Sequence, residues 1–188
     1  MMNKILDMIR AAKIIVMQLE IPVDIVEYVA KLAKSLGKMV VLDPAPAISH
    51  LPLDLYKNTD ILKPNETELQ TLCGKVVNNE QDIIECAKTL VEKGVKNVIV
   101  TLGEKGSILV NDRSIQKFNA IKVDVVDTTA AGDSFTAGLV KMLNEGKSLN
   151  EAIEFGHIVS SMAVTKYGAQ SSIPSPKEVQ KFIETGEY

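Results

Sequence analysis

The sequence predicts an α/β fold with a mostly parallel sheet and helices on both of its faces. Short apolar runs of strand type alternate with segments of helical periodicity along most of the 188 residues. Neither a linker nor an internal repeat interrupts this alternation, and 46% of the residues are apolar, which is typical of an ordinary globular protein. Because a chain of this length can bury one core, a single domain over residues 1–188 is expected.

The first strand and helix patterns lie before residue 45. Lys13–Leu19 is a short apolar run of buried-strand type. The next helix starts with Pro22 in its first turn and ends before Gly37, and Met39–Leu42 is the following strand. The positions that we expect this helix to turn toward the core are Ile25, Val26, Val29, Leu32, Ala33 and Leu36.

The middle of the chain continues the alternation. A short helix is expected near Leu53–Lys57, and Ile61 and Leu62 lie in a further strand. Asn65 caps a helix that runs to about Cys73. Another helix is marked by the apolar positions Ile83, Ile84, Ala87, Leu90 and Val91.

The second half begins with a strong strand pattern at Asn97–Leu102 and closes with helices. Ser107–Val110 is expected to pair with Ile115–Phe118. Two long helices are expected, at about Gly132–Asn144 and Leu149–Lys166, and a last one follows Ser175.

Composition excludes several classes of protein. The formal net charge of −3 argues against nucleic acid as a partner, since nucleic-acid binding favours a basic face. No run of 18 apolar residues is present, so no membrane span is expected. The first ten residues have no signal-peptide pattern, and Cys73 and Cys86 lack metal-ligand spacing. These observations favour a cytoplasmic protein with reduced thiols.

The stretch Asp127–Phe135 carries the clearest chemistry. Small residues between two aspartates let backbone N–H groups converge into an anion-binding nest, and a helix N-terminus follows. Asp133 then lies beside a phosphate-sized hole, where it can take a proton from an attacking hydroxyl. This pattern indicates a base and an anion hole for phosphoryl transfer. Two alternatives remain open: Asp133 as a simple N-cap, and small residues that serve only close packing.

This stretch resembles the C-terminal signature of the ribokinase family, the PfkB-type sugar kinases. The resemblance implies that Asp133 is the catalytic base and also contacts the substrate, and that Ala130, Ala131 and Gly132 form the anion hole. It also implies that Glu20, in Gln-Leu-Glu at the end of the first strand, contacts the sugar, although a solvent-facing charge explains this position equally well. The turn that begins at Asp43 resembles the family too; Asn is common there in place of Asp43.

Two further motifs resemble the family's nucleotide and metal sites. The resemblance places Asn65 near the phosphates and Glu68 in the Mg²⁺ shell through water, whereas a capping box accounts for both residues without any ligand. His157 is implied to lie beside the adenine, although a lone helical His is usually structural. The implied ATP-binding loop, which also reads as a Gly-bounded hairpin turn, consists of Thr101, Leu102, Gly103, Glu104, Lys105 and Gly106, with Gly132 joining from the anion hole.

A monovalent-cation site is implied where the second long helix ends. Gly168 alone reads as the C-cap of that helix. By resemblance, K⁺ there would fix the anion-hole loop without touching substrate. Its implied ligands are the carbonyls of Thr129, Ala163, Lys166 and Gly168, the Asp127 carboxylate and Ser172 Oγ.

The resemblance covers the chain but only the C-terminal part of a ribokinase. The family's first strand with its sugar-binding Asp, its lid and its Gly-Gly hinge do not precede Met1. We therefore expect a ribokinase-like three-layer sandwich truncated at the N-terminus, with an exposed sheet edge that favours a homo-oligomer. The expected reaction is ATP-dependent phosphorylation of a pentose, D-ribose to D-ribose 5-phosphate, impaired in the isolated chain. The alternatives are another sugar or nucleoside kinase of the family, or a non-catalytic nucleotide-binding remnant.

Overall fold

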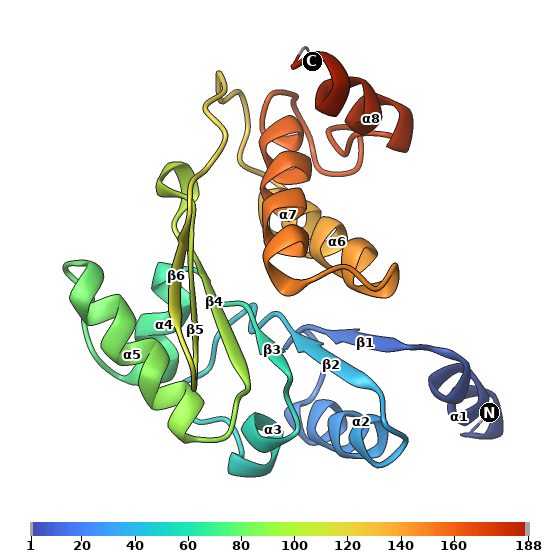
Figure 1. The fold of residues 1–188 in the computed structure, drawn as a ribbon. Helices are drawn as coiled ribbons and strands as arrows, with labels where there is room; N and C mark the ends of the chain where they lie inside the picture. The colour runs from blue at the N-terminus through green and yellow to red at the C-terminus, as the bar shows by residue number, and fades with distance from the viewer. Residues whose placement is uncertain (1, 187–188) are drawn as a thin grey trace. The chain divides into compact units, whose positions relative to one another are not determined.

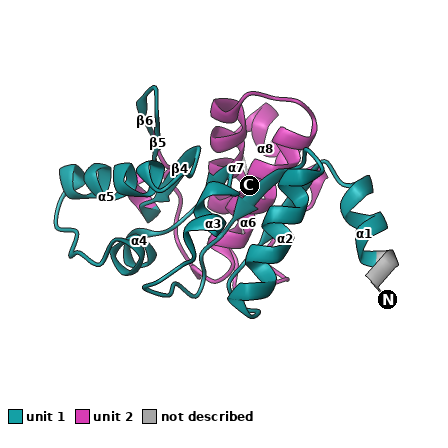
Figure 2. Ribbon diagram, turned by 90° about the horizontal axis from the view of Figure 1, so that it is seen from below, with its two compact units in different colours: residues 1–103, 107–117 teal, residues 104–106, 118–188 magenta. Residues whose placement is uncertain are grey.

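The computed structural model describes residues 2–186 and divides them into two compact units (Figure 2). Unit 1 comprises the chain up to Gly103 together with Ser107–Lys117. Unit 2 comprises Glu104–Gly106 and the chain from Phe118 onward. The single domain expected over residues 1–188 stays a prediction.

A six-stranded sheet in the order β1-β2-β3-β4-β5-β6 organises the first unit (Figure 1). Its first four strands are parallel, with Met17 beside Leu42 and Leu42 beside Leu62. β5 is antiparallel to β4, so the expected mostly parallel sheet is confirmed. The strands are β1 Ile14–Met17, β2 Met39–Leu42, β3 Ile61–Leu62, β4 Asn97–Thr101, β5 Ser107–Asn111 and β6 Ile115–Phe118.

Four of the helices of unit 1 pack on one face of this sheet. Their apolar side chains share a core cluster with alternate strand residues, such as Val40 and Leu42 of β2 and Val98 and Val100 of β4. Alternation of this kind follows from the two-residue period of a strand. The helices are α2 Val23–Ser35, α3 Leu53–Lys57, α4 Glu66–Cys73 and α5 Glu80–Glu92, and α1 Met2–Ala11 precedes the sheet.

The buried stripe of α2 differs from the expected one. Val26 and Ala33 are buried as expected, but Ala30 joins them and Ile25 is 46% exposed. Positions 26, 30 and 33 are spaced by four and three residues, so they lie on one side of the helix. The core takes this narrow stripe of small side chains, and Ile25 lies about 100° away from it.

Asp60 joins the sheet to its helices at the N-terminal ends of the strands. Its carboxylate accepts hydrogen bonds from Lys34 Nζ at 2.7 Å and the Val40 N–H at 2.8 Å, and Lys96 Nζ lies 2.8 Å away. Burial alone would raise the Asp60 pKa, but the hydrogen bonds from both lysines and from Val40 lower it overall. This cluster lies at the edge of the sheet opposite to the strand ends that carry the candidate site.

Unit 2 contains α6 Ala131–Asn144, α7 Leu149–Ala163 and α8 Pro176–Thr185. α6 and α7 approach closely at two glycines: a Cβ added to Gly138 would lie 3.0 Å from the Gly156 Cα. α7 was expected to reach Lys166 but ends at Ala163, because the Val164 carbonyl accepts the N–H groups of Val126 and Asp127. Among residues 2–186, no helix is both long and apolar enough to cross a bilayer.

Candidate functional site

The carboxyl ends of the parallel strands in unit 1 carry several of the expected polar residues. Glu20 follows β1 and is exposed, and the Leu19 N–H donates to the Ala45 carbonyl at 2.9 Å, which joins the segments after β1 and β2. Asn65, after β3, forms a parallel bridge with Thr101 at the end of β4. Ligands of parallel α/β sheets bind at this edge. The structure therefore brings the Asn65 and Thr101 motifs together, although they are 36 residues apart in the sequence.

Asn65 and Glu68 form a complete capping box at the start of α4. Asn65 Oδ1 accepts the Glu68 N–H and Glu68 Oε2 accepts the Asn65 N–H, both at 2.8 Å. Burial, and then the negative charge of Asp43, raise the pKa of the Glu68 carboxyl, against the hydrogen bond from Asn65 and the positive charge of Lys63.

The structural interpretation of these two residues is correct, and it leaves room for the metal role. The second oxygen of Glu68 accepts no hydrogen bond from the described residues, and Mg²⁺ commonly binds through one or two carboxylates, waters and substrate phosphates. Over residues 2–186, no group of three or more His, Cys, Asp or Glu is placed to hold a metal by itself. The second oxygen of Glu68 fits a Mg²⁺ shell whose other ligands are water or phosphate oxygens.

Sequence reasoning missed a buried ion pair at the same edge of the sheet. Asp43 directly follows β2 and Lys63 directly follows β3, and Lys63 Nζ lies 2.9 Å from Asp43 Oδ2. Both side chains are almost fully buried. The resemblance of the turn at Asp43 to the family is a signal at one partner, whereas no motif in the sequence marks Lys63.

The expected nucleotide loop is the connection of the β4–β5 hairpin. Thr101 pairs with Ser107, and a short 3₁₀ helix, Gly103–Lys105, fills the turn. Leu102 packs into the core cluster, whereas Glu104 is exposed. The hairpin interpretation of this segment is therefore correct, and its role in nucleotide binding stays a prediction.

The anion-hole sequence occupies the start of α6 in unit 2. Ala130 is the N-cap residue and adopts a left-handed conformation with φ 61°, the one non-glycine among the described residues to do so. No side chain of the N-cap residue caps the helix, and the Ala131 N–H donates to the Thr128 carbonyl at 3.2 Å. The first N–H groups of a helix have no intrahelical acceptor. Asp133 is the third residue of α6, exposed in that first turn, so its interpretation as the N-cap is wrong. A left-handed residue before a right-handed helix is the geometry of an anion nest.

The residues expected to bind a monovalent cation lie together in unit 2. Asp127 Oδ1 accepts the Thr129 N–H at 2.9 Å, and Oδ2 accepts the Gly168 N–H at 3.0 Å. Hydrogen bonds from the Thr129 hydroxyl, then from the two backbone N–H groups, lower the Asp127 pKa. Ser172 is buried and donates to the Ala169 carbonyl at 2.8 Å. Asp127 thus ties the anion-hole loop to the turn after α7.

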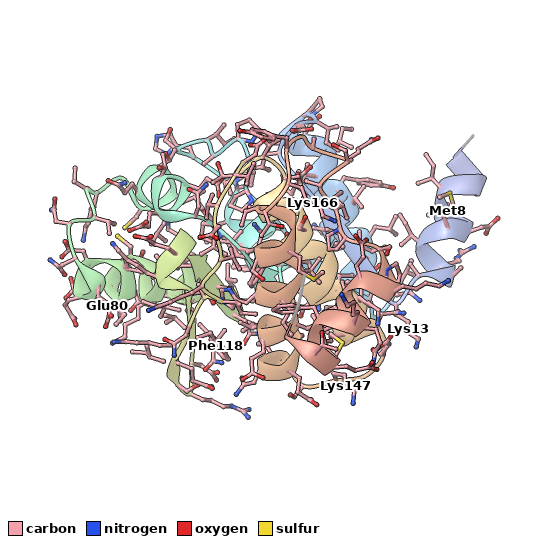
Figure 3. The ribbon with its side chains drawn as sticks, turned by 90° about the horizontal axis from the view of Figure 1, so that it is seen from above. Met8, Lys13, Glu80, Phe118, Lys147 and Lys166 are labelled. Atoms are coloured by element: carbon pink, nitrogen blue, oxygen red, sulfur yellow. The ribbon has the colours of Figure 1, made fainter. Side chains whose placement is uncertain are left out.

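Two of the expected carbonyl ligands have further constraints. The Ala163 carbonyl accepts the Lys166 N–H at 3.3 Å, a long hydrogen bond that leaves a lone pair for a cation. Lys166, which follows α7 (Figure 3), pairs with Glu178 through Nζ at 2.8 Å, so its own side chain is directed to α8. The set of donors consists of oxygens and fits a hard cation such as K⁺.

His157 lies in the contact between α6 and α7. It is 7% exposed, and its ring meets the Phe135 ring edge-on with centroids 5.0 Å apart. Burial lowers the His157 pKa to about 4, so the imidazole is neutral near pH 7. The structural role is present, and the expected place beside an adenine stays a prediction.

The expected site residues therefore form two groups, one in each unit. Glu20, Asn65, Glu68 and the loop residues up to Gly103 lie in unit 1, whereas Glu104–Gly106, His157, the expected anion nest with Asp133 and the expected cation ligands lie in unit 2. A nest beside a carboxylate is an arrangement that suits the binding of an anionic group next to a base.

The model of the pfkB family carbohydrate kinases matches residues 3–176, and the chain belongs to this family. It is 44% identical to a ribokinase of Haemophilus influenzae over 170 residues, which cover 90% of this chain and 55% of the relative. It is 42% identical to a ribokinase of Staphylococcus aureus, with 93% and 58% covered. The structure of Arabidopsis thaliana ribokinase complexed with ribose and ATP superimposes with a TM-score of 0.91 at 37% identity, covering 97% of this chain and 59% of that one.

These matches confirm the ribokinase-like α/β fold. The chain spans a little more than half the length of the curated ribokinases that it matches.

Proposed function

We propose that this chain carries the nucleotide-binding and catalytic part of an ATP-dependent sugar kinase whose acceptor is the primary hydroxyl of a pentose. D-Ribose, converted to D-ribose 5-phosphate, is the expected acceptor. The observation that carries the proposal is the geometry at the start of α6. Ala130 adopts a left-handed conformation, it makes no side-chain cap, and Asp133 lies in the first turn that follows. Non-glycine residues in this conformation are uncommon and concentrate at functional sites.

The proposed reaction uses the Asp133 carboxylate as the base. It takes the proton of the sugar hydroxyl, whose oxygen forms a bond to the γ-phosphorus of ATP. The bond from that phosphorus to the bridging oxygen breaks, and ADP leaves. The N–H groups of Ala130, Ala131 and Gly132 would stabilise the charge on the transferring group, where positioning and electrostatics supply most of the catalysis.

The remaining residues would bind and orient the substrates. Glu20 would accept hydrogen bonds from sugar hydroxyls, and Asn65 with the Thr101–Gly106 hairpin would hold the nucleotide. Glu68 would hold the water shell of Mg²⁺, which neutralises phosphate charge when bound. K⁺ at the Asp127 carboxylate would hold the loop 127–130 in place.

The comparisons support ATP and ribose as the substrates. The two relatives described above are named ribokinase, and the Arabidopsis ribokinase that superimposes on nearly the whole chain was solved with ribose and ATP. A cytoplasmic location and association through the sheet edge belong to the same proposal. β1 pairs with β2 on one side, and Val16 on this strand is 43% exposed.

A coupled assay of ADP release with ATP and ribose tests the reaction, and calorimetry with ATP or ADP and Mg²⁺ tests binding separately. We expect nucleotide binding, together with weak ribose phosphorylation that rises when the N-terminal part of a ribokinase is supplied in trans. Binding without turnover of ribose, other sugars or nucleosides, even with that part added, would favour the non-catalytic remnant. A folded sample that binds no nucleotide would contradict the proposal.

A further inference from the structure

The buried pair of Asp43 and Lys63 joins two adjacent parallel strands at the ligand-binding edge of the sheet. Leu42 and Leu62, which precede the two residues, are paired in register, and the Lys63 N–H donates to the Leu42 carbonyl at 3.0 Å. The side chains are 6% and 4% exposed, and the ion-pair distance is 2.9 Å. The two charges are therefore held in a fixed place at the ends of β2 and β3.

An ion pair in this position needs an explanation beyond stability. Removing two charges from water is costly, and well-packed apolar residues of similar volume often stabilise a protein as well or better. The charges lie where a ligand would bind, which favours a role in binding.

Glu68 is the third charge of this cluster. It lies in the first turn of α4, five residues after Lys63, and is half-buried. Its Oε2 accepts the N–H of Asn65, two residues after Lys63, at 2.8 Å, so the carboxylate lies beside the segment that carries Lys63. The charges of Asp43 and Lys63 have opposite effects on the Glu68 pKa. The Lys63 ammonium thus has two carboxylates in its surroundings, and the structure pairs it with Asp43.

We propose that Asp43 holds the Lys63 ammonium away from Glu68, so that the Glu68 carboxylate remains available to the water shell of a nucleotide-bound Mg²⁺. Asp43 is then a positioning residue, and the inference rests on the proposed nucleotide-binding function. The three groups carry a formal charge of −1, which attracts a cation. Without the Asp43 charge the sum is zero, and the Lys63 ammonium would be drawn to the Glu68 carboxylate.

This arrangement predicts opposite effects on two binding reactions. Asp43→Asn should weaken the response to Mg²⁺, because Lys63 then competes with the metal shell for Glu68. Changes to groups that orient a metal ligand typically cost 10–100-fold in metal affinity, so we expect about a tenfold higher Mg²⁺ midpoint. Binding of metal-free ADP should be unchanged or tighter, because the added positive charge attracts phosphate.

The test is calorimetry of ADP binding across a Mg²⁺ titration and in excess chelator, with the wild-type chain and three variants. Asp43→Asn should show the shifted Mg²⁺ midpoint, and Asp43→Asn/Lys63→Met should return it to within about threefold of wild type, since no ammonium remains to occupy Glu68. Asp60→Asn is the matched control, because Asp60 also pairs with lysines but at the opposite ends of the strands. It should lower stability without moving the midpoint. Asp43→Ser replaces Asp43→Asn if the latter does not fold.

The outcomes separate the inference from the proposed function. A wild-type chain that binds no nucleotide overturns both. If wild type binds and Asp43→Asn keeps the wild-type Mg²⁺ midpoint, or loses equal affinity with and without Mg²⁺, the pair only joins β2 to β3 and the inference is wrong.

Discussion

Replacing Gly106 with alanine should destabilise the protein far more than the same change at Gly103 in the same hairpin. Gly106 has φ +91°, and a Cβ there would lie 1.9 Å from the Phe118 carbonyl oxygen, with Ala120 N at 2.8 Å. Gly103 also has a positive φ, +57°, but a Cβ there meets nothing within 4 Å. The two variants share the backbone strain and differ in the steric overlap.

The expected magnitudes follow from these contacts. A non-glycine residue in the left-handed region costs about 1–2 kcal/mol, which applies to both variants. At Gly106 the backbone must also open by roughly 1 Å before the contact reaches 3.0 Å, the lower limit for real Cβ atoms. Overpacking of this kind costs about 1–3 kcal/mol, occasionally more. We therefore expect losses of about 1–2 kcal/mol for Gly103→Ala and about 2–5 kcal/mol for Gly106→Ala.

Urea unfolding of the two variants and the wild type measures these losses as changes in the free energy of unfolding. The slope with urea should stay the same, since neither change alters the surface exposed on unfolding. A Gly106→Ala variant with no folded baseline agrees with the upper end of the range. Equal losses within about 0.5 kcal/mol would refute the reasoning, because the added methyl group would then meet no obstacle.

Three further results are expected. Asp133→Asn should lower any kinase activity about 10²–10⁴-fold while nucleotide still binds, and activity within a few-fold of wild type would remove Asp133 as the base. K⁺ should tighten nucleotide binding relative to Na⁺ at matched ionic strength, and this difference should vanish in Asp127→Asn; identical binding in both salts would argue against the cation site. Burial lowers the His157 pKa from 6.5 to about 4 in the folded state. Between pH 4 and pH 6.5 the unfolded state therefore binds more protons than the folded state. Stability should therefore fall as pH decreases from about 6.5 to 4, by roughly 3 kcal/mol at most, and His157→Gln should lose this dependence in urea titrations.

The sequence alone determined the features that depend on neighbouring residues. Asn65 and Glu68 predicted a capping box that the structure contains, and Ser175 marked the start of α8. The strand at Met39–Leu42 was predicted with the bounds that the structure has. Hydrogen bonds of caps and the periodicity of apolar residues act over three or four positions, so these signals can be read without the rest of the chain.

Only the tertiary structure decided which distant residues meet. The pairing of Asp43 with Lys63 depends on β2 and β3 being adjacent and in register, and the bridge from Asn65 to Thr101 depends on the same sheet edge. The end of α7 at Ala163 was decided by Val126 and Asp127, which take the Val164 carbonyl from nearly 40 residues away. Likewise, the Ile25 side chain is exposed because a different side of α2 packs against the sheet. Such contacts arise from the register and packing of whole elements, and residue spacing along the chain carries no direct record of them.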